Sequence, residues 1–338
     1  MEENKPTQEE EISSNEDNAV KTETNIYKEI SLLCLSLLVL GLVLFPQTKT
    51  DKMPSNVVAF ENNTKEVFEN PFEEISIDAK SAYVLDLNTD EAIFSLNENV
   101  QLPLASLTKV MTALTALEST PSHTVIKIQL SDLRSEGDSG LLVDERWTLK
   151  DLIDFSLVTS SNDGALAISS SVGSNILGTE GKRELGREEF IKRMNSIANN
   201  LDLSNTYFLN ESGLDENLNV SGGYSTAREI AELFGYSITK YREDFKQTTV
   251  KDYTALSLNN IPHEAQNTNQ YVDNIPMLIG SKTGFTDLAG GNLVIAFNAG
   301  LSKPIVVSVM GSTIDGRFSD AEKLVFATLK YIQTKQDE

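Results

Sequence analysis

Three short motifs along this chain contain the residue types that acyl transfer needs. In chain order they are Ser106-x-x-Lys109, Ser160-x-Asn162 and Lys282-Thr283-Gly284. A serine hydroxyl becomes an effective nucleophile only when a nearby group removes its proton. The motifs therefore suggest a serine nucleophile whose base is a lysine rather than a histidine.

The spacing of the first motif suits a nucleophile and its base. On a helix, positions i and i+3 share a face, so Ser106 and Lys109 would point the same way. The helix is otherwise apolar, so Lys109 would be partly desolvated, which lowers the pKa of its amine towards neutral pH. Ser106 would lie in the first turn, where backbone N–H groups and the helix dipole favour a developing oxyanion. The alternative is a serine that caps a helix and a lysine that reaches solvent.

The other two motifs offer groups that could hold a substrate. Ser160 and Asn162 lie between two predicted helices, where a hydroxyl could relay a proton to a leaving amine and an amide could hold a carbonyl. A simple helix cap is the alternative there. Lys282 and Thr283 come late in a predicted strand and can grip a carboxylate, while Gly284 lets a substrate backbone approach the sheet edge.

Two further segments resemble nucleophile motifs but receive no catalytic role. Ser237-x-x-Lys240 lies at a predicted helix end, and we interpret it as structural. Gly137-Asp138-Ser139-Gly140 resembles the nucleophile segment of chymotrypsin-like proteases, but His123 lies only 16 residues before Ser139, too close for that fold. His123 and His263 are expected at the surface or in loops. No Cys/His pair has ligand spacing, so we expect no metal.

The hydrophobic pattern predicts the elements that position these motifs. Apolar residues at 107, 110, 111, 114 and 117 mark one face of a helix after Pro103. Thr148 should cap a helix, and Thr226 with Glu229 matches a capping box. Strands are expected at 82–87, 92–96, 278–283, 292–298 and 304–310, and helices at 149–158, 163–171, 188–200, 225–234 and 320–332. This order predicts an α+β domain, with an antiparallel sheet built from both ends and a mostly helical subdomain between.

The N-terminal region has a different composition. Residues 1–25 are acidic with almost no large apolar residue, which predicts a disordered tail. Residues 26–46 contain an uncharged, Leu-rich run, which we interpret as a transmembrane signal anchor in the lipid bilayer. A cleaved signal peptide or a buried core helix are the alternatives. Residues 47–70 would form a linker to a folded domain at 71–334.

Charge and cysteine content exclude some classes of function. The formal net charge of −22 argues against nucleic acid, whose binding needs a basic stripe. Cys34 is the only cysteine, so no disulfide can form within the chain. Lysines lie equally on both sides of the apolar run, so positive charge does not orient it.

The residues that flank the motifs resemble the D-alanyl-D-alanine carboxypeptidases, which are low-molecular-mass penicillin-binding proteins with a β-lactamase/transpeptidase-like fold. The segments that carry this resemblance surround the three motifs and part of the helical region: 104–114, 157–163, 190–195, 206–210, 213–215 and 280–290. It extends over about residues 75–332, nearly the whole predicted domain.

The resemblance implies roles for the motif residues. The catalytic residues would be Ser106 as acyl-enzyme nucleophile, Lys109 as its base and Ser160 as an aid to proton transfer. The substrate-binding residues would be Asn162, Lys282, Thr283 and Gly284, with the terminal carboxylate on Lys282 and Thr283. Backbone N–H groups of Ser106 and Phe285 would form the oxyanion hole. No cofactor is implied.

The substrate implied by the resemblance is a peptidoglycan stem peptide ending in D-Ala-D-Ala, which would lose its last D-alanine to water. β-Lactam antibiotics would acylate the same serine. This substrate lies outside the cytoplasm, so we expect an extracytoplasmic catalytic domain and a cytoplasmic N-terminus in a single-pass cell-membrane protein of cell-wall synthesis and cell shape. The chain differs from many family members in stopping soon after Ile332 and in having Ser161 where glycine is commoner.

Other functions remain as alternatives. A D,D-endopeptidase or transpeptidase would use the same groups, because acceptor choice depends on the shape of the cleft. A β-lactamase would need a deacylating glutamate, which the segment from Asp215 to Asn219 matches only partly. A peptidoglycan-binding protein without catalytic activity is an alternative from a different functional class. The intact nucleophile, base and carboxylate-binding residues argue against it.

Overall fold

The computed structural model describes residues 70–179 and 181–337, which contain all three motifs. The acidic tail at 1–25, the anchor at 26–46 and the linker up to residue 69 lie outside the described residues. Within the two described ranges, no helix is long and apolar enough to cross a membrane.

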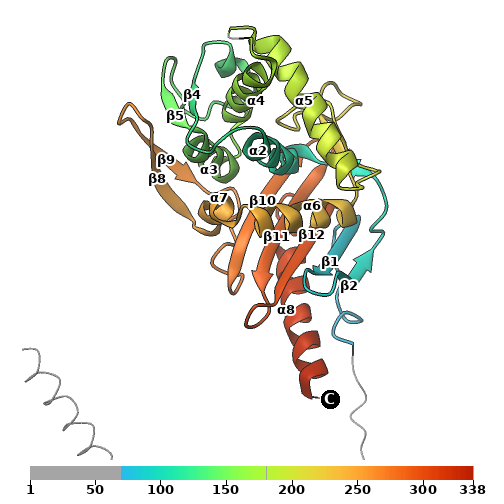
Figure 1. Cartoon of the computed structure of the whole chain (residues 1–338). Helices are drawn as coiled ribbons and strands as arrows, with labels where there is room; N and C mark the ends of the chain where they lie inside the picture. Colours follow the sequence, from blue (N-terminus) through green and yellow to red (C-terminus); the bar gives the residue numbers. More distant parts are fainter. Residues whose placement is uncertain (1–69, 180, 338) are drawn as a thin grey trace, which may run out of the picture. The chain divides into compact units, whose positions relative to one another are not determined.

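A five-stranded antiparallel sheet joins strands from the two ends of the domain (Figure 1). Its strand order is β10-β11-β12-β1-β2. The strands are β1 (Ser81–Asp86), β2 (Glu91–Leu96), β10 (Leu278–Thr286), β11 (Gly290–Asn298) and β12 (Pro304–Ser312). The expected α+β arrangement with a sheet from both ends is confirmed.

The sheet is covered by a helix on each face because its strands alternate their side chains. Along β12, Ile305 and Val307 pack with residues of α8 (Gly316–Asp337), whereas Val306 and Met310 pack with residues of α6 (Ala227–Lys240). All of these side chains are buried. Each contributes about 1.5–3 kcal/mol by leaving water, so the two-sided burial fixes the register of β12 and of its neighbour β11.

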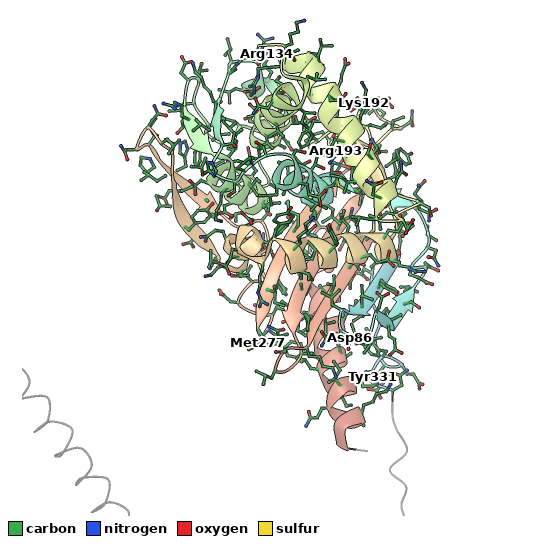
Figure 2. The ribbon with its side chains drawn as sticks, viewed as in Figure 1. Asp86, Arg134, Lys192, Arg193, Met277 and Tyr331 are labelled. Atoms are coloured by element: carbon green, nitrogen blue, oxygen red, sulfur yellow. The ribbon has the colours of Figure 1, made fainter. Side chains whose placement is uncertain are left out.

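A helical subdomain lies beside the sheet, with α2 (Thr108–Ser119) at its centre (Figure 1). Every α2 residue from Thr108 to Ala116 is buried, because other helices pack around it. These helices are α6, α3 (Leu149–Thr159), α4 (Asn162–Leu177) and α5 (Arg183–Asn200). Lys192 and Arg193 project from the outer side of α5 into solvent (Figure 2).

Several element bounds differ from the sequence-based expectation. The helix after Pro103 begins as a 3₁₀ turn, η1 (Ala105–Leu107), and α4, α5, α6 and α8 extend beyond their expected ends. Elements of two to five residues were not predicted at all, because such short segments show too little periodicity. They are β3 (Leu102–Pro103), β4 (Val125–Lys127), η2 (Asp132–Arg134), β5 (Arg146–Thr148), β6 (Tyr207–Phe208), β7 (Gly223–Ser225), α7 (Arg242–Phe245), η3 (Lys246–Thr249), β8 (Asp252–Leu256) and β9 (Pro262–Gln266).

Both predicted helix caps form, one of them only in part. The Thr148 side chain accepts from the backbone N–H of Asp151 at the start of α3. Thr226 accepts from the backbone N–H of Glu229 at the start of α6. The Glu229 carboxylate does not return to the cap, however. It accepts from the Asn205 backbone N–H instead. A hydrogen bond to the loop that contains Asn205 therefore takes the place of the second half of the capping box.

Candidate active site

The fold brings the three motifs into one hydrogen-bonded network. Lys109 Nζ lies 2.9 Å from Ser106 Oγ and donates to Asn162 Oδ1 at 2.7 Å. Lys282 Nζ donates to Ser160 Oγ at 2.9 Å. The first motif comes from η1 and α2, the second from the α3–α4 junction and the third from β10, so the sequence-predicted residues meet across the helical subdomain and the sheet.

Ser106 lies in the 3₁₀ turn that precedes α2, rather than in the first α-helical turn that the sequence suggested. The 3₁₀ turn ends at Leu107 and continues directly into α2, so Ser106 and Lys109 remain on one side with Oγ and Nζ 2.9 Å apart. The residue before it, Ala105, is fully buried with φ of 48°, a left-handed conformation that is costly for a residue with a Cβ. Gly213 packs so tightly on Ala105 that an added Cβ would lie 1.8 Å from the Ala105 carbonyl oxygen.

Lys109 is buried and held by three acceptors. Besides Ser106 and Asn162, its Nζ donates to the backbone carbonyl of Ser212 at 2.8 Å. Burial lowers the pKa of Lys109 to about 7, while the negative charge of Glu211 raises it in part. A large fraction of Lys109 is therefore neutral near pH 7 and able to accept a proton.

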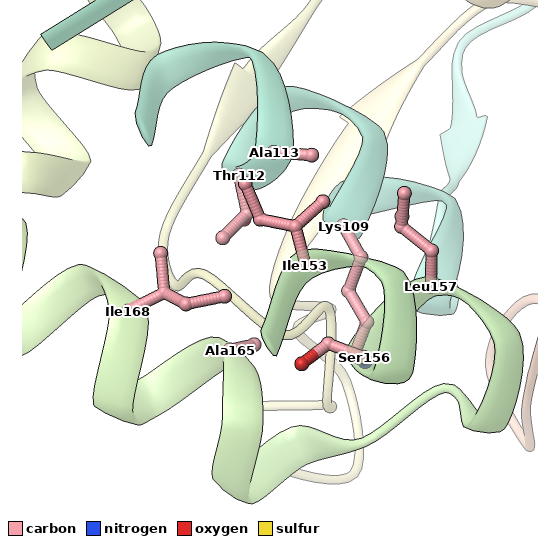
Figure 3. A pocket seen from close by; sticks show the side chains of 8 residues that line it. All are labelled: Lys109, Thr112, Ala113, Ile153, Ser156, Leu157, Ala165 and Ile168. Carbon is pink, nitrogen blue, oxygen red and sulfur yellow. The ribbon is translucent and has the colours of Figure 1, made fainter. Parts of the chain in front are cut away.

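The desolvation of Lys109 comes from apolar side chains of three helices. A cavity of about 10 Å³ beside its stem is lined by Ala113 of α2, Ile153 and Leu157 of α3, and Ile168 of α4 (Figure 3). These groups exclude water from the lysine stem, which explains why burial is the largest cause of its pKa shift. The apolar helix predicted from the sequence thus has the proposed effect, and residues of α3 and α4 add to it.

The three consecutive residues of the second motif have two roles: one caps a helix, and the other two contact the catalytic lysines. Ser161 caps α4 by accepting from the Gly164 backbone N–H, and its Oγ also lies 2.6 Å from Ser139 Oγ. Ser160 precedes this cap with φ of 61°, a left-handed C-cap of α3. The capping explanation therefore holds for Ser161 and leaves Ser160 and Asn162 directed to the site. The Asn162 amide is itself oriented, because its Nδ2 donates to the Glu136 carbonyl at 2.7 Å.

The third motif presents a second buried lysine. Lys282 is 1 % exposed, and burial is the main reason that its pKa falls well below the usual value. The positive charges of Lys109 and Arg317 lower the pKa of Lys282 further. An anion bound here would offset both causes, so this lysine is suited to receive a carboxylate. Thr283 lies beside it, and its Oγ1 is 2.7 Å from Thr268 Oγ1.

The end of β10 lies against the backbone of the nucleophile. A Cβ at Gly284 would lie 2.9 Å from the Leu104 carbonyl and 3.1 Å from the Ser106 nitrogen. Glycine is thus needed for the approach of β10 to η1, in addition to any substrate that approaches the edge. Arg317 Nη1 donates to the Gly284 carbonyl at 2.8 Å and fixes the strand end. Phe285 follows and is 43 % exposed; the oxyanion hole of Ser106 and Phe285 remains a prediction.

A cavity of about 390 Å³ continues the site beyond Ser160 and Asn162. One wall is the segment Gly137-Asp138-Ser139, which resembles a nucleophile motif in sequence but has no catalytic role assigned to it. Another is β9, through Glu264 and Gln266. A peptide could lie in this open cavity next to the motif residues.

The histidines occupy two different environments. His123 is exposed, as expected. His263 is not a surface residue, which corrects the sequence-based expectation. Its side chain is buried against Trp147 and Phe155, with Nε2 2.6 Å from Glu145 Oε1. This pair ties β9 to the β4–β5 hairpin, a tertiary contact that sequence alone does not show.

Some residues of the site network were missed in the sequence. Glu211 and Ser212 lie around Lys109, and Arg187 forms an ion pair with Glu211 at 2.8 Å. The other missed residues are Thr268, which contacts Thr283, and Arg317, which binds the Gly284 carbonyl. The resemblance to the carboxypeptidases covered the flanking segments 206–210 and 213–215 but not Glu211 or Ser212, so no sequence signal marked these two residues. Isolated polar residues elsewhere carry no pattern that would distinguish them from surface residues.

Comparison with known proteins places this arrangement in a family. The family model described as D-alanyl-D-alanine carboxypeptidase matches residues 65–313. The carboxypeptidase DacF of Bacillus subtilis is 30 % identical over 273 residues, which are 76 % of this chain but only 64 % of DacF. A D-alanyl-D-alanine endopeptidase of Escherichia coli is 30 % identical over 252 residues, or 72 % of this chain and 75 % of that protein.

A solved structure shows the same fold. A Streptomyces DD-transpeptidase mutant superposes with a TM-score of 0.67 at 25 % identity, covering 76 % of this chain and all of that one. The match of the family model to most of the chain, together with the assembled motifs, is decisive: this chain belongs to the D-alanyl-D-alanine carboxypeptidase family.

Proposed function

We propose that this protein is a serine-type D-Ala-D-Ala carboxypeptidase that removes the terminal D-alanine from peptidoglycan stem peptides. The observation that carries the proposal is the contact of Ser106 with Lys109, a buried lysine whose pKa is lowered to about 7. A buried, partly neutral lysine next to a serine is the arrangement that activates a hydroxyl near neutral pH. Membership of the carboxypeptidase family supports the choice of substrate.

Acylation would begin with neutral Lys109. Its Nζ takes the proton of the Ser106 hydroxyl while Oγ attacks the carbonyl carbon of the penultimate D-alanine. The oxyanion accepts from the backbone N–H groups of Ser106 and Phe285. As the C–N bond breaks, the leaving nitrogen receives the proton that Lys109 took, relayed by the Ser160 hydroxyl, which Lys282 holds in place.

Deacylation would reuse the same base. Lys109 takes a proton from water, whose oxygen attacks the ester carbonyl, and then returns a proton to Ser106 Oγ as the C–O bond breaks. A β-lactam would form the same ester with Ser106. When the β-lactam ring opens, the leaving nitrogen stays attached to the acyl group. It therefore continues to occupy the cleft and hinders the approach of water to the ester.

Recognition of the free carboxylate would rest on Lys282 and Thr283. The carboxylate of the terminal D-alanine supplies the anion that this buried lysine lacks, so binding and full protonation of Lys282 are coupled. A substrate without a carboxylate at this position would lose the contacts with Lys282 and Thr283 and should bind more weakly.

The alternatives differ in what the structure offers them. The endopeptidase relative is as similar in sequence as the carboxypeptidase relative, so an endopeptidase is the second candidate. For a β-lactamase, the partial match at Asp215 would have to activate water. The Asp215 carboxylate instead accepts from Thr286 Oγ1 at 3.1 Å, at the end of β10.

Two assays test this function. A fluorescent penicillin should label the protein, and Ser106→Ala should abolish the labelling; labelling that survives would overturn the serine assignment. A pentapeptide ending in D-Ala-D-Ala should release free D-alanine, and a crosslinked dimer should remain uncut. Cleavage of the dimer with no release from the pentapeptide would favour the endopeptidase.

The proposed substrate lies outside the cytoplasm, so we also propose that residues 26–46 anchor the domain on the outer side of the cell membrane. Protease added to spheroplasts should then digest the catalytic domain while the membrane stays intact. Protection of the domain until detergent is added would contradict this location.

A further inference from the structure

The loop at residues 136–140 lies against the start of α4, where the second motif is located. It contains Gly137-Asp138-Ser139-Gly140, the segment that resembles a nucleophile motif in sequence. Within the described residues, the hydrogen-bonding partner of Ser139 Oγ is another hydroxyl, Ser161 Oγ, at 2.6 Å. A serine that contacts a hydroxyl instead of a base is not activated for attack. The contact of Ser139 with the second motif therefore needs a different explanation.

The loop is exposed, and its backbone is permissive. Gly137 and Gly140 have φ of 86° and 81°, and four of the five loop residues are exposed. Such a loop changes conformation at low cost unless side chains hold it. Ser161 can do so, because it is 3 % exposed at the start of α4, where its Oγ accepts from the Gly164 backbone N–H at 2.9 Å.

The position of the loop determines the orientation of the Asn162 amide. Asn162 Nδ2 donates to the Glu136 carbonyl at 2.7 Å, and Oδ1 accepts from Lys109 Nζ at 2.7 Å. An amide rotated by half a turn would place Nδ2 against the lysine amine and Oδ1 against the carbonyl, so both hydrogen bonds would be lost. In the observed orientation one Nδ2 hydrogen is bound to Glu136, and the other can donate to a substrate carbonyl.

We propose that the hydroxyls of Ser139 and Ser161 hold the loop 136–140 on α4 and thereby direct the Asn162 amide to the substrate. Both serines are positioning residues that act through Asn162. They also fix one wall of the 390 Å³ cavity, which both of them line. The inference rests on the proposed function, which assigns Asn162 to substrate binding. Glycine, the commoner residue at position 161, has no hydroxyl and could not make this contact.

Removal of either hydroxyl tests the pair. Ser139→Ala and Ser161→Gly should each lower kcat/KM for D-alanine release from a pentapeptide by about three- to tenfold, the effect of one lost hydrogen bond. Ser161→Gly should still cap α4, because glycine costs little at that position. The double variant should be no slower than the single ones, since both break the same contact. Ser139→Thr keeps the hydroxyl and should retain the native kcat/KM.

A second comparison tests whether the pair acts through Asn162. In an Asn162→Ala background, Ser139→Ala should not lower kcat/KM further, whereas a general disturbance of the cleft would lower it in both backgrounds. The matched control is Ser135→Ala, which removes a hydroxyl outside the pair and should leave kcat/KM unchanged. A native rate in Ser139→Ala, or an equal loss in the Asn162→Ala background, would overturn the proposal.

NMR of the purified full-length chain without substrate separates this inference from the proposed function. The Nδ2 protons of Asn162, assigned through Asn162→Ala, should exchange with water faster in Ser139→Ala and Ser161→Gly than in the native chain or in Ser135→Ala. Unchanged exchange would overturn the role of the hydroxyl pair. A native chain that releases no D-alanine would overturn the proposed function alone, because the exchange measurement needs no activity.

Discussion

The chain contains the pattern Ser-x-x-Lys twice, and the two lysines reach opposite chemical states. Lys109 is 2 % exposed, and burial lowers its pKa to about 7. Lys240 lies at the end of α6 with a 44 % exposed side chain, and hydrogen bonds to Glu118 and Tyr236 raise its pKa above the usual value. Lys240 is therefore fully protonated at neutral pH, whereas Lys109 is partly neutral.

The two serines differ in a similar way. Ser106 lies in a 3₁₀ turn with its Oγ against the lysine amine. Ser237 is buried in the middle of a helical turn, where its Oγ donates to the Leu233 carbonyl four residues earlier. That bond occupies the hydroxyl with the helix itself. The same spacing thus gives an activated serine only at Ser106, where the serine lies in a 3₁₀ turn and the lysine is buried.

The largest expected contrast is between the two serine substitutions. Ser106→Ala should lower the rate of acylation by penicillin by about 10⁴-fold or more, because no other group can take its place. Ser237→Ala should leave the acylation rate unchanged and cost less than about 1 kcal/mol in the free energy of unfolding. Acylation followed by a fluorescent penicillin, and unfolding in urea, measure both. Equal effects of the two substitutions would remove the distinction between the motifs.

The next contrast concerns the lysines. Lys109→Arg keeps the positive charge but cannot deprotonate, so kcat/KM should fall by about 10²–10⁴-fold. Lys240→Arg keeps the surface pair with Glu118 and should have no effect on kcat/KM. D-Alanine release from a pentapeptide is the measurement. An active Lys109→Arg variant would show that another group is the base.

The pH dependence should follow Lys109. Its neutral form accepts the serine proton, and below a pKa of about 7 the amine is increasingly protonated. The value of kcat/KM should therefore fall about tenfold for each pH unit below this point, which is the behaviour of a single essential base. A pH–rate profile between pH 5 and 9 measures it. A profile that is flat from pH 5 to 7 would contradict a lysine base.

Removal of the carboxylates beside each lysine should give smaller effects. Glu211 raises the pKa of Lys109, so Glu211→Gln should move the acid limb of the rate profile to lower pH. It also leaves the partly buried Arg187 with only the longer ion pair to Glu184 at 3.8 Å, at a cost of about 2 kcal/mol in the free energy of unfolding. Glu118→Gln, beside the exposed Lys240, should cost less than about 1 kcal/mol and leave the profile in place. A shift of the limb to higher pH in Glu211→Gln would reverse the electrostatic assignment.

Local patterns in the sequence accounted for the main elements of the fold. The apolar runs along β1, β11 and β12 reflect burial on both faces of the sheet, and the 3.6-residue repeat after Pro103 marks the most apolar face of α2, so both patterns are visible in the chain. The 3₁₀ turn at Ala105 was not visible, because its environment includes Gly213, which packs on Ala105 from more than a hundred residues away in the chain. The short strands beside the site likewise depend on tertiary contacts such as His263 with Glu145.

The site was predicted at the level of its three motifs but not of their surroundings. The sequence order selected Ser106, Lys109 and Lys282, and the structure brings them together. It did not reveal that Ser212 and Glu211 surround the lysine, because a buried glutamate has no sequence pattern that separates it from a surface glutamate. The pKa difference between Lys109 and Lys240 follows from those surroundings and not from the motif.

Titration of the individual lysines by NMR tests the central claim most directly. With lysine labelled by ¹³C at Cε, and resonances assigned through Lys109→Arg and Lys240→Arg, the two pKa values can be read in one experiment. We expect Lys109 to titrate at about pH 7 and Lys240 above the other surface lysines. Titration of Lys109 together with the surface lysines, at their ordinary alkaline pH, would contradict its role as a neutral base.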